Sequence, residues 1–434
     1  MKRLVLENLL DWKNSTNRKP LIIRGARQVG KTFTVKEFGD QHFSGQCHVV
    51  DLEKYPDWIR VFEKDLDPDR IKNELAVLLD QTIKPGKDLL FIDEIQHSPR
   101  AIMALRYFYE DLPDLHVIAA GSLLEFALKE ISFPVGRVQM MTMYPMNFME
   151  FLMALKKGNA VALLRSDPQN LSEPVHDMLL NYMRNYMFVG GMPECVKVWR
   201  DKQSLTEVFA VQRDLVNTYR QDFSKYAPYV DKRSLNQVLT NVSKNIGKQT
   251  IYSRLSADFT GPTNKKAFEL LMDARVITKV KATAVSSLPL GESVSDRKFK
   301  SFLVDIGLMR TLSDMPANME YQKTDLMSLY NGALAEHFVG QELLSSGFEQ
   351  LYYWSRDAKS SSAEVDYLIV KDGKICPIEV KSGASGKLRS LHQLLKDYPN
   401  IEQGYVLSTV PFGSIPEQKL TFLPLYYAWR LAQG

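Results

Sequence analysis

The chain has 434 residues, of which 45% are hydrophobic and 24% are charged, and its formal net charge is +4. This length exceeds one typical hydrophobic core, so two or three domains are expected. The weak positive charge permits nucleic-acid binding but does not argue for it.

The number of cysteines and the hydropathy of the chain indicate in which cellular compartment the protein is found. Cys47, Cys195 and Cys376 lie far apart without a C-x-x-C motif, which excludes a disulfide framework, argues against a zinc site and suits a reducing cytosol. Polar residues interrupt the first fifteen positions every few residues, so this segment predicts an amphipathic helix and not a signal peptide. No apolar run is long enough to span a bilayer. We therefore expect a cytoplasmic protein without a membrane partner.

The first third of the chain alternates short apolar runs with helical patterns, which is typical of a parallel sheet with crossover helices. This alternation of apolar runs and helical patterns ends near Pro145. We predict an α/β domain over residues 1–155. Its predicted strands are 21–24, 48–52, 88–93 and 116–121, with a fifth in the segment after Gly136.

The segment GARQVGKT matches the phosphate-loop pattern G-x-x-x-x-G-K-[ST] at every defined position, after a predicted strand and before a helical pattern. In such a loop, backbone N–H groups and a helix N-terminus close around phosphates. Lys31 is predicted to reach the β- and γ-phosphates, and Thr32 to ligate magnesium. The predicted nucleotide-binding residues of the loop are Gly25, Ala26, Arg27, Gln28, Val29, Gly30, Lys31 and Thr32.

The second half of the predicted Mg-ATP site follows the apolar run LLFI. Asp93 ends this strand, where a magnesium ligand is needed, and the adjacent Glu94 can orient or deprotonate the attacking water. Ser122 ends the next strand, where it can sense the γ-phosphate or simply cap a helix. Arg137 is a candidate arginine finger or sensor, with a surface ion pair as the alternative. The sequence thus predicts an ATPase.

Residues 156–315 are predicted to be mainly helical. Three helical patterns between 234 and 277, followed by two strand-like pieces, have the element order of a winged helix. The third pattern offers only Lys265, Lys266 and Arg275 as basic residues, so base readout is poor and a packing module is favoured over DNA binding.

A third domain is predicted over residues 325–434, and its most informative feature is a hairpin. Asp372-Gly373 is a favoured two-residue turn between apolar strands. This turn places Asp366 opposite Glu379, with Cβ atoms roughly 5 Å apart. Facing carboxylates repel one another unless a cation lies between them, and magnesium or manganese fits. Lys381 is then near enough to activate water for attack on a phosphodiester.

The same register offers a second interpretation of the hairpin. It puts Glu364 opposite Lys381, so the face can also be a solvated surface with one cross-strand ion pair. Geometry alone favours this simpler interpretation.

A resemblance shifts that balance. Asp366, Glu379 and Lys381 resemble the D…E-x-K core of restriction-endonuclease-like (PD-(D/E)xK) nucleases. Glu336, on the preceding predicted helix, is similar to the helical acidic residue of many such enzymes. The proline before the first acid is absent here. The resemblance implies metal ligands at Glu336, Asp366 and Glu379, and a catalytic role for Lys381.

The order of motifs over nearly the whole chain resembles a bacterial and archaeal family of AAA-type ATPases. Members join the ATPase core to a winged-helix segment and a nuclease-like C-terminal domain. The motifs are GARQVGKT, LLFIDEIQ, AAGS, GRV, YPMNFMEF, VGGMPE, FLVDIGLMR and PIEVKSG. The resemblance implies nucleotide roles for Gly25, Gly30, Lys31, Thr32, Asp93 and Glu94.

Two functions remain open from the sequence. In the first, ATP binding or hydrolysis is coupled to a nuclease-like domain that acts on nucleic acid, with DNA as the partner. In the second, the chain is a signalling or regulatory ATPase switch whose C-terminal domain is a non-cleaving binding module. ATP and Mg²⁺ serve both, and a protein partner or a homo-oligomer is compatible with both.

Overall fold

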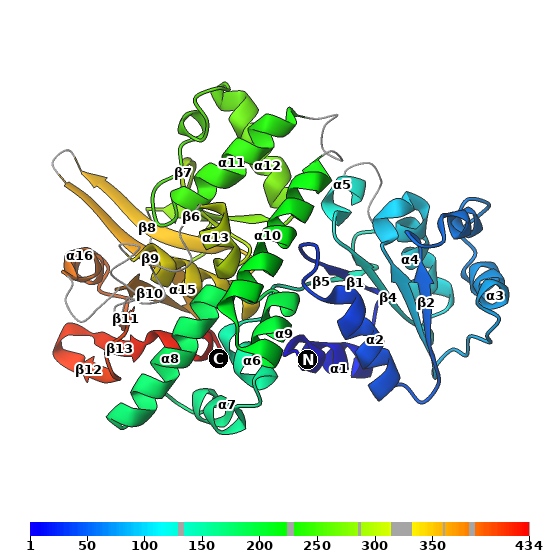
Figure 1. The fold of residues 1–434 in the computed structure, drawn as a ribbon, viewed down its shortest axis with the longest axis horizontal. Coiled ribbons are helices and arrows are strands. Elements are labelled where there is room, and N and C mark those ends of the chain that lie inside the picture. The colour runs from blue at the N-terminus through cyan, green and yellow to red at the C-terminus, as the bar shows by residue number, and fades with distance from the viewer. Residues whose placement is uncertain are drawn as a thin grey trace. The chain divides into compact units, whose positions relative to one another are not determined.

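The computed structural model describes residues 1–128, 134–223, 230–284, 288–313, 332–358, 361–381 and 387–433. It forms two compact units (Figure 1). Unit 1 contains Met1–Tyr144 with Asp273–Arg275, and unit 2 contains Pro145–Met272 with Val276–Gly434. The two domains predicted after residue 155 thus share unit 2, and the three-domain division stays a prediction.

Unit 1 is built on a five-stranded sheet with the order β2-β3-β4-β1-β5, in which every pairing is parallel. The predicted parallel sheet is confirmed, and each predicted strand is present. Its strands are β1 (Leu21–Arg24), β2 (Cys47–Asp51), β3 (Leu89–Asp93), β4 (His116–Gly121) and β5 (Gln139–Thr142). Its helices are α1 (Val5–Asn14), α2 (Lys31–His42), α3 (Pro68–Leu79), α4 (Pro99–Asp111) and α5 (Leu124–Leu128).

The strand order decides where the predicted site residues meet. Strand β4 lies between β1 and β3, and every residue of β3 and β4 is buried, as expected for a parallel sheet covered on both faces. Arg24 pairs in register with Gly121, and Asp51 with Asp93. The carboxyl ends of β1, β4 and β3 therefore share one edge, where ligands of open α/β sheets bind.

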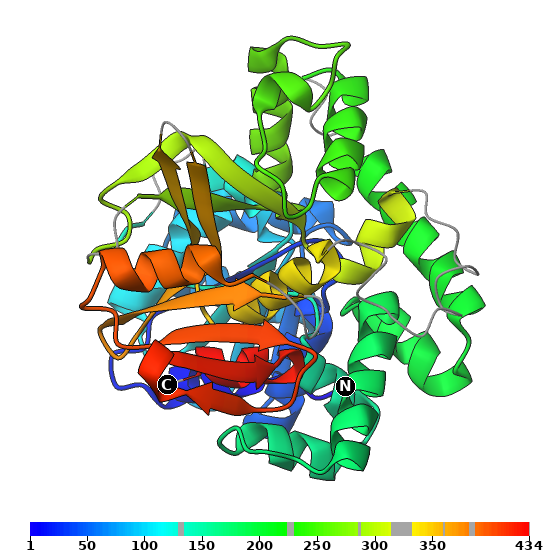
Figure 2. The same cartoon turned by 90° about the vertical axis from the view of Figure 1, so that its left-hand side faces the viewer.

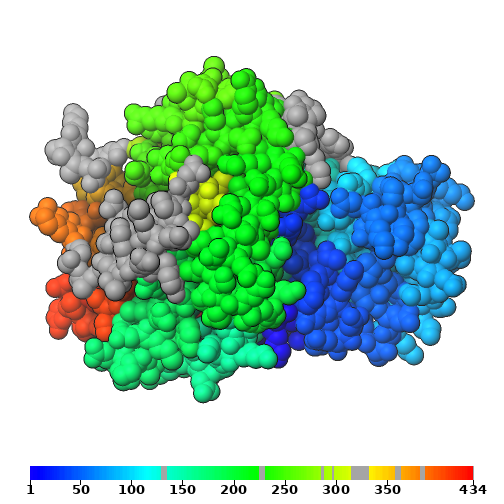
Figure 3. Space-filling model, viewed as in Figure 1, coloured from blue at the N-terminus to red at the C-terminus, as the bar shows by residue number. Residues whose placement is uncertain are grey.

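Unit 2 begins with helices, which form much of its surface on the face shown in Figure 3. They are α6 (Phe148–Ala154), α7 (Gly158–Arg165), α8 (Glu173–Val189), α9 (Pro193–Lys202), α10 (Leu205–Asp222), α11 (Lys232–Lys244) and α12 (Gly261–Asp273). The mainly helical middle region is as predicted. Among the described residues, none of the helices is both long and apolar enough to cross a membrane.

A buried network joins three of the sequence motifs in unit 2. Asp305 accepts hydrogen bonds from the backbone N–H of Gly191 (2.6 Å) and of Gly307 (3.0 Å), and it caps helix α13 (Ile306–Leu312). The backbone N–H of Met146 donates to the carbonyl of Gly191 (2.7 Å). The motifs YPMNFMEF, VGGMPE and FLVDIGLMR therefore meet in one core of unit 2.

The rest of unit 2 is an eight-stranded mixed sheet with the order β12-β13-β11-β10-β9-β8-β6-β7 (Figure 2). Its strands are β6 (Ile277–Thr283), β7 (Val294–Leu303), β8 (Leu351–Ala358), β9 (Ser361–Lys371), β10 (Lys374–Val380), β11 (Gly404–Ser408), β12 (Gly413–Ile415) and β13 (Leu420–Pro424). Its further helices are α15 (Ala333–Ser345), α16 (Arg389–Asp397) and α17 (Ala428–Ala432).

The segment predicted as a winged helix differs from that expectation in two details. Between α11 and α12 there is only a single 3₁₀ turn, Tyr252–Arg254. The strand pair β6–β7 does not stand alone, because β6 pairs in parallel with β8. These two strands extend the same sheet that carries the predicted nuclease-like residues.

Candidate nucleotide site and C-terminal carboxylate cluster

The phosphate loop has the backbone conformation that its glycines predict. Gly25 has φ +155°, and a Cβ atom there would lie 2.2 Å from the carbonyl oxygen of Met143. Gly30 has φ +94° and immediately precedes α2, so the loop opens directly into a helix N-terminus. Arg3 Nη1 donates to the carbonyl of Val29 (2.9 Å) and holds the loop from outside, a contact that the sequence did not predict.

Lys31 lies inside this loop. Its Nζ donates to the carbonyls of Gly25 (3.0 Å) and Ala26 (2.9 Å), and the residue is 7% exposed. Burial lowers the pKa of Lys31 to about 8, although the carboxylates of Glu94 and Asp93 oppose this shift. The ammonium is therefore within electrostatic range of both carboxylates that were predicted to share the site.

Asp93 and Thr32 meet as predicted from the two motifs. Asp93 is buried at the end of β3, and its carboxylate accepts a hydrogen bond from the Thr32 side chain. Burial raises the pKa of Asp93 above its ordinary value. A hydroxyl at the start of α2 and a carboxylate at the end of β3 form the donor set that Mg²⁺ takes in phosphate-loop sites, so the residues fit the ion.

Glu94 stands in an unusual backbone conformation. Its φ is +51°, in the left-handed region, which turns the chain sharply after β3. Its Oε2 accepts a hydrogen bond from Nε2 of Gln96 (2.5 Å). Oε1 of Gln96 is buried without a hydrogen-bond partner. Gln96 is thus a neighbour of the predicted base that sequence reasoning missed.

Three further predicted site residues of unit 1 are Ser122, which is buried, and Arg27 and Arg137, which form ion pairs. Ser122 is buried and follows β4, which lies between β1 and β3. Arg27 pairs with Glu53 (3.5 Å) at the rim. Arg137 Nε donates to Glu110 (2.7 Å) on the surface of α4, which is the ion-pair alternative for this residue.

Family models match three successive parts of the chain. Residues 17–152, which hold the phosphate loop, Asp93 and Glu94, match a model described as an AAA domain. The N-terminal domain is an AAA-type P-loop ATPase domain. Residues 180–319 and 331–426 match models described as domains of unknown function, DUF8612 and DUF4143. Neither description names a winged helix or a nuclease.

Solved structures provide remote similarities, while no curated protein matches the chain. A Walker-type ATPase of Pyrococcus abyssi is 15% identical; the match covers 72% of this chain and 95% of that one, with a TM-score of 0.45. The ORC1 protein of Aeropyrum pernix, solved with DNA, is 12% identical, with coverages of 71% and 90% and a TM-score of 0.31. The RuvB branch migration motor of Thermotoga maritima is 14% identical, with coverages of 68% and 93% and a TM-score of 0.30.

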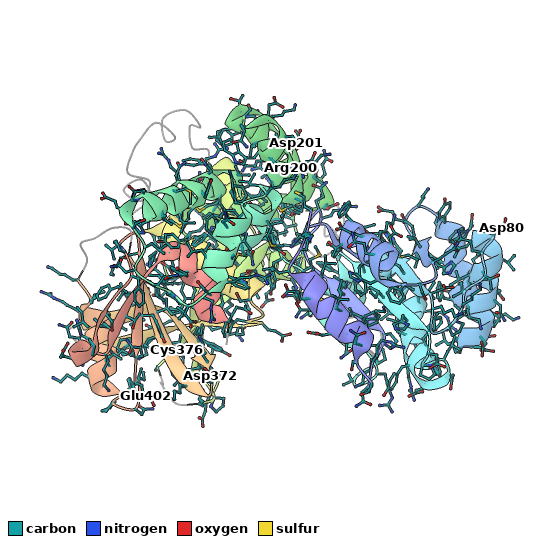
Figure 4. All side chains as sticks on the ribbon, turned by 90° about the horizontal axis from the view of Figure 1, so that it is seen from below. Asp80, Arg200, Asp201, Asp372, Cys376 and Glu402 are labelled. Atoms are coloured by element: carbon teal, nitrogen blue, oxygen red, sulfur yellow. The ribbon has the colours of Figure 1, made fainter. Side chains whose placement is uncertain are left out.

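Beyond the ATPase domain, the predicted hairpin register is confirmed. Lys371 pairs with Lys374 and Tyr367 with Ile378, so paired positions follow the predicted spacing. Asp372 (φ +51°) and Gly373 (φ +72°) form the turn. Figure 4 shows Asp372 near the end of the sheet where Cys376 and Glu402 also lie.

The carboxylates at the other end of this hairpin lie close together. Oδ2 of Asp366 accepts from the backbone N–H of Val380 (2.8 Å). Oε1 of Glu379 pairs with Lys381 (2.5 Å), and its Oε2 is buried without a hydrogen-bond partner. Burial and the nearby charge of Asp366 raise the pKa of Glu379 to about 8.

The cation among these acids is a lysine that sequence reasoning missed. Lys300, on β7, has its Nζ 2.8 Å from Glu336 and 3.3 Å from Asp366, and it also pairs with Glu364. The predicted Glu364–Lys381 pair is replaced by pairs of Glu364 with Lys300 and of Lys381 with Glu379. No sequence signal marked Lys300, because it lies 36 positions from Glu336 and 66 from Asp366.

Proposed function

We propose that the chain hydrolyses ATP with Mg²⁺ at the edge of the unit 1 sheet. The observation that carries the proposal is the meeting of Lys31 and Thr32, at the start of α2, with Asp93 and Glu94, at the end of β3. Thr32 and Asp93 would hold Mg²⁺, whose charge offsets that of the phosphates.

Each side chain then has a distinct role. Lys31 binds the β- and γ-phosphates, exchanging two carbonyl partners for phosphate oxygens. Glu94 orients the attacking water and accepts its proton once its hydrogen bond with Gln96 opens. Ser122 contacts the γ-phosphate from the end of β4, and Arg137 serves as a surface ion pair.

The test separates binding from hydrolysis. Glu94→Gln should bind ATP as the wild type does but hydrolyse it at least about 100-fold more slowly, since general bases contribute on that order. Lys31→Ala should lose ATP binding itself. Equal loss of binding and turnover in Glu94→Gln would contradict the role of Glu94 as the base.

For the C-terminal domain we propose the switch interpretation, in which it is a non-cleaving binding module. The ammonium of Lys300 bonds Glu336 and Asp366, the same carboxylates that the nuclease interpretation assigns to a metal. The β6–β7 pair, which continues the same sheet, is proposed as a packing element rather than a DNA reader.

A cleavage assay decides between the two interpretations. Wild-type protein, with Mg²⁺ or Mn²⁺ and with or without ATP, is incubated with single-stranded and double-stranded DNA. We expect intact DNA under all conditions. Cleavage that disappears in Asp366→Ala while ATP hydrolysis persists would establish the nuclease-coupled ATPase instead.

A further inference from the structure

The Lys300 side chain is buried within the sheet of unit 2. Its side chain is 3% exposed, and its Nζ lies 5.2 Å from the ring centroid of Tyr353. A lysine is almost never buried to this degree unless it is paired. The three carboxylates around it come from two other elements: Glu336 from α15, and Glu364 and Asp366 from β9.

The ion pairs keep Lys300 charged. Burial lowers the pKa of Lys300, but the carboxylates of Glu336, Asp366 and Glu364 outweigh burial and raise it well above its ordinary value. The positive charge is therefore a fixed part of the folded protein. If that charge were removed, the negatively charged carboxylates would repel one another in a partly buried site.

The carboxylates of Glu336, Asp366 and Glu379 are the kind of ligand that a divalent metal takes, but their oxygen atoms do not come close enough together to form a metal site. Among the described residues, only Glu53, Glu94 and His97 bring three ligand atoms within 4.8 Å of one another. Glu336, Asp366 and Glu379 do not, and Lys300 bonds the first two of them. One oxygen of Glu379, a residue 6% exposed, still lacks a hydrogen-bond partner.

We propose that Lys300 is an internal cation that fills the divalent-metal position of the Glu336–Asp366–Glu379 cluster and keeps metal out. Its ammonium uses the carboxylate oxygens that an Mg²⁺ or Mn²⁺ ion would take, and its charge repels a second cation. Lys300 belongs to the strand pair that precedes the C-terminal region, so the middle of the chain determines the chemistry of the later segment. The inference rests on the proposed non-cleaving role and gives its cause.

The test is Mn²⁺ binding, measured by electron paramagnetic resonance on the nucleotide-free, full-length chain. Wild type and Lys300→Ala are compared with Lys374→Ala, a control that removes an exposed lysine of the same sheet. Lys300→Ala should gain one equivalent of bound Mn²⁺, with a dissociation constant on the order of 1 mM or tighter. The control should match the wild type. Any Mn²⁺ held near Glu94 is common to all three proteins and cancels in the comparison.

Two further variants test whether the gained Mn²⁺ is bound by this cluster and provide for the case that Lys300→Ala does not fold. Lys300→Ala combined with Asp366→Asn should lose the gained equivalent. Should Lys300→Ala fail to fold, Lys300→Met with Glu336→Gln removes one charge of each sign and should gain a weaker site through Asp366 and Glu379. Two results would overturn the proposal: Mn²⁺ binding by the wild type that depends on Asp366, or a folded Lys300 variant that binds no more Mn²⁺ than the wild type. Mn²⁺ binding is measured without DNA. A wrong prediction about Mn²⁺ binding can therefore be told apart from a wrong prediction about DNA cleavage.

Discussion

Replacing Lys31 with methionine should stabilise the nucleotide-free protein while it abolishes ATP binding. Lys31 is 7% exposed, and among the described residues its ammonium donates to two backbone carbonyls, those of Gly25 and Ala26. Burial lowers its pKa from the ordinary 10.5 to about 8, even with Glu94 and Asp93 nearby. The folded protein therefore holds this proton less tightly than the unfolded chain does.

The sign and size of the effect follow from that difference. Below pH 8 the lysine is protonated in both states, and the lowered pKa disfavours the folded state by roughly 3 kcal/mol. As the pH rises from 8 to 10.5, the folded protein loses the proton first and the penalty fades. Lys31→Met should thus raise the free energy of unfolding by up to about 3 kcal/mol at pH 7, and by less at pH 9.5.

Urea unfolding at pH 7, 8 and 9.5 measures this effect, with Lys36→Met as the control because Lys36 is exposed on the same helix. ATP affinity is measured in parallel by calorimetry. In the wild type it should fall as pH rises above 8, by up to tenfold per pH unit, because binding requires the protonated lysine. A Lys31→Met protein that is less stable than the wild type at pH 7, or a gain that is unchanged at pH 9.5, would refute the reasoning.

Three further predictions concern other parts of the chain. Gly191→Ala should lower the free energy of unfolding by about 1–3 kcal/mol in urea, because its Cβ would lie 1.9 Å from the carbonyl of Met146; an unchanged midpoint would contradict this packing. Burial raises the pKa of Glu342 to about 8, so the wild type should lose stability as pH rises from 4.5 to 8. Glu342→Gln should show a flatter profile of melting temperature against pH, and equal slopes would exclude a buried neutral carboxyl. Arg137→Ala should change ATP turnover by about twofold or less, since exposed pairs such as Arg137–Glu110 contribute little; a loss greater than about tenfold would make Arg137 a catalytic arginine.

The sequence alone determined the features that depend on neighbouring residues. The phosphate loop was predicted because Gly25 and Gly30 must adopt positive φ at fixed spacing before a helix. The strands of unit 1 were predicted because a buried parallel strand is a continuous apolar run. The hairpin register followed from Asp372-Gly373, since a two-residue turn fixes all later pairings.

Only the tertiary structure decided what surrounds these motifs. The sheet order placed β4 between β1 and β3 and so brought Ser122 between the phosphate loop and Asp93. The fold also brought Lys300 among the acids of the hairpin, although nothing in the sequence of its strand, VSDRKFKSFL, distinguishes it from the nearby Lys298. Ion pairs between distant segments leave no periodicity in a sequence, because the charge that each carboxylate meets is set by strand pairing across the whole sheet.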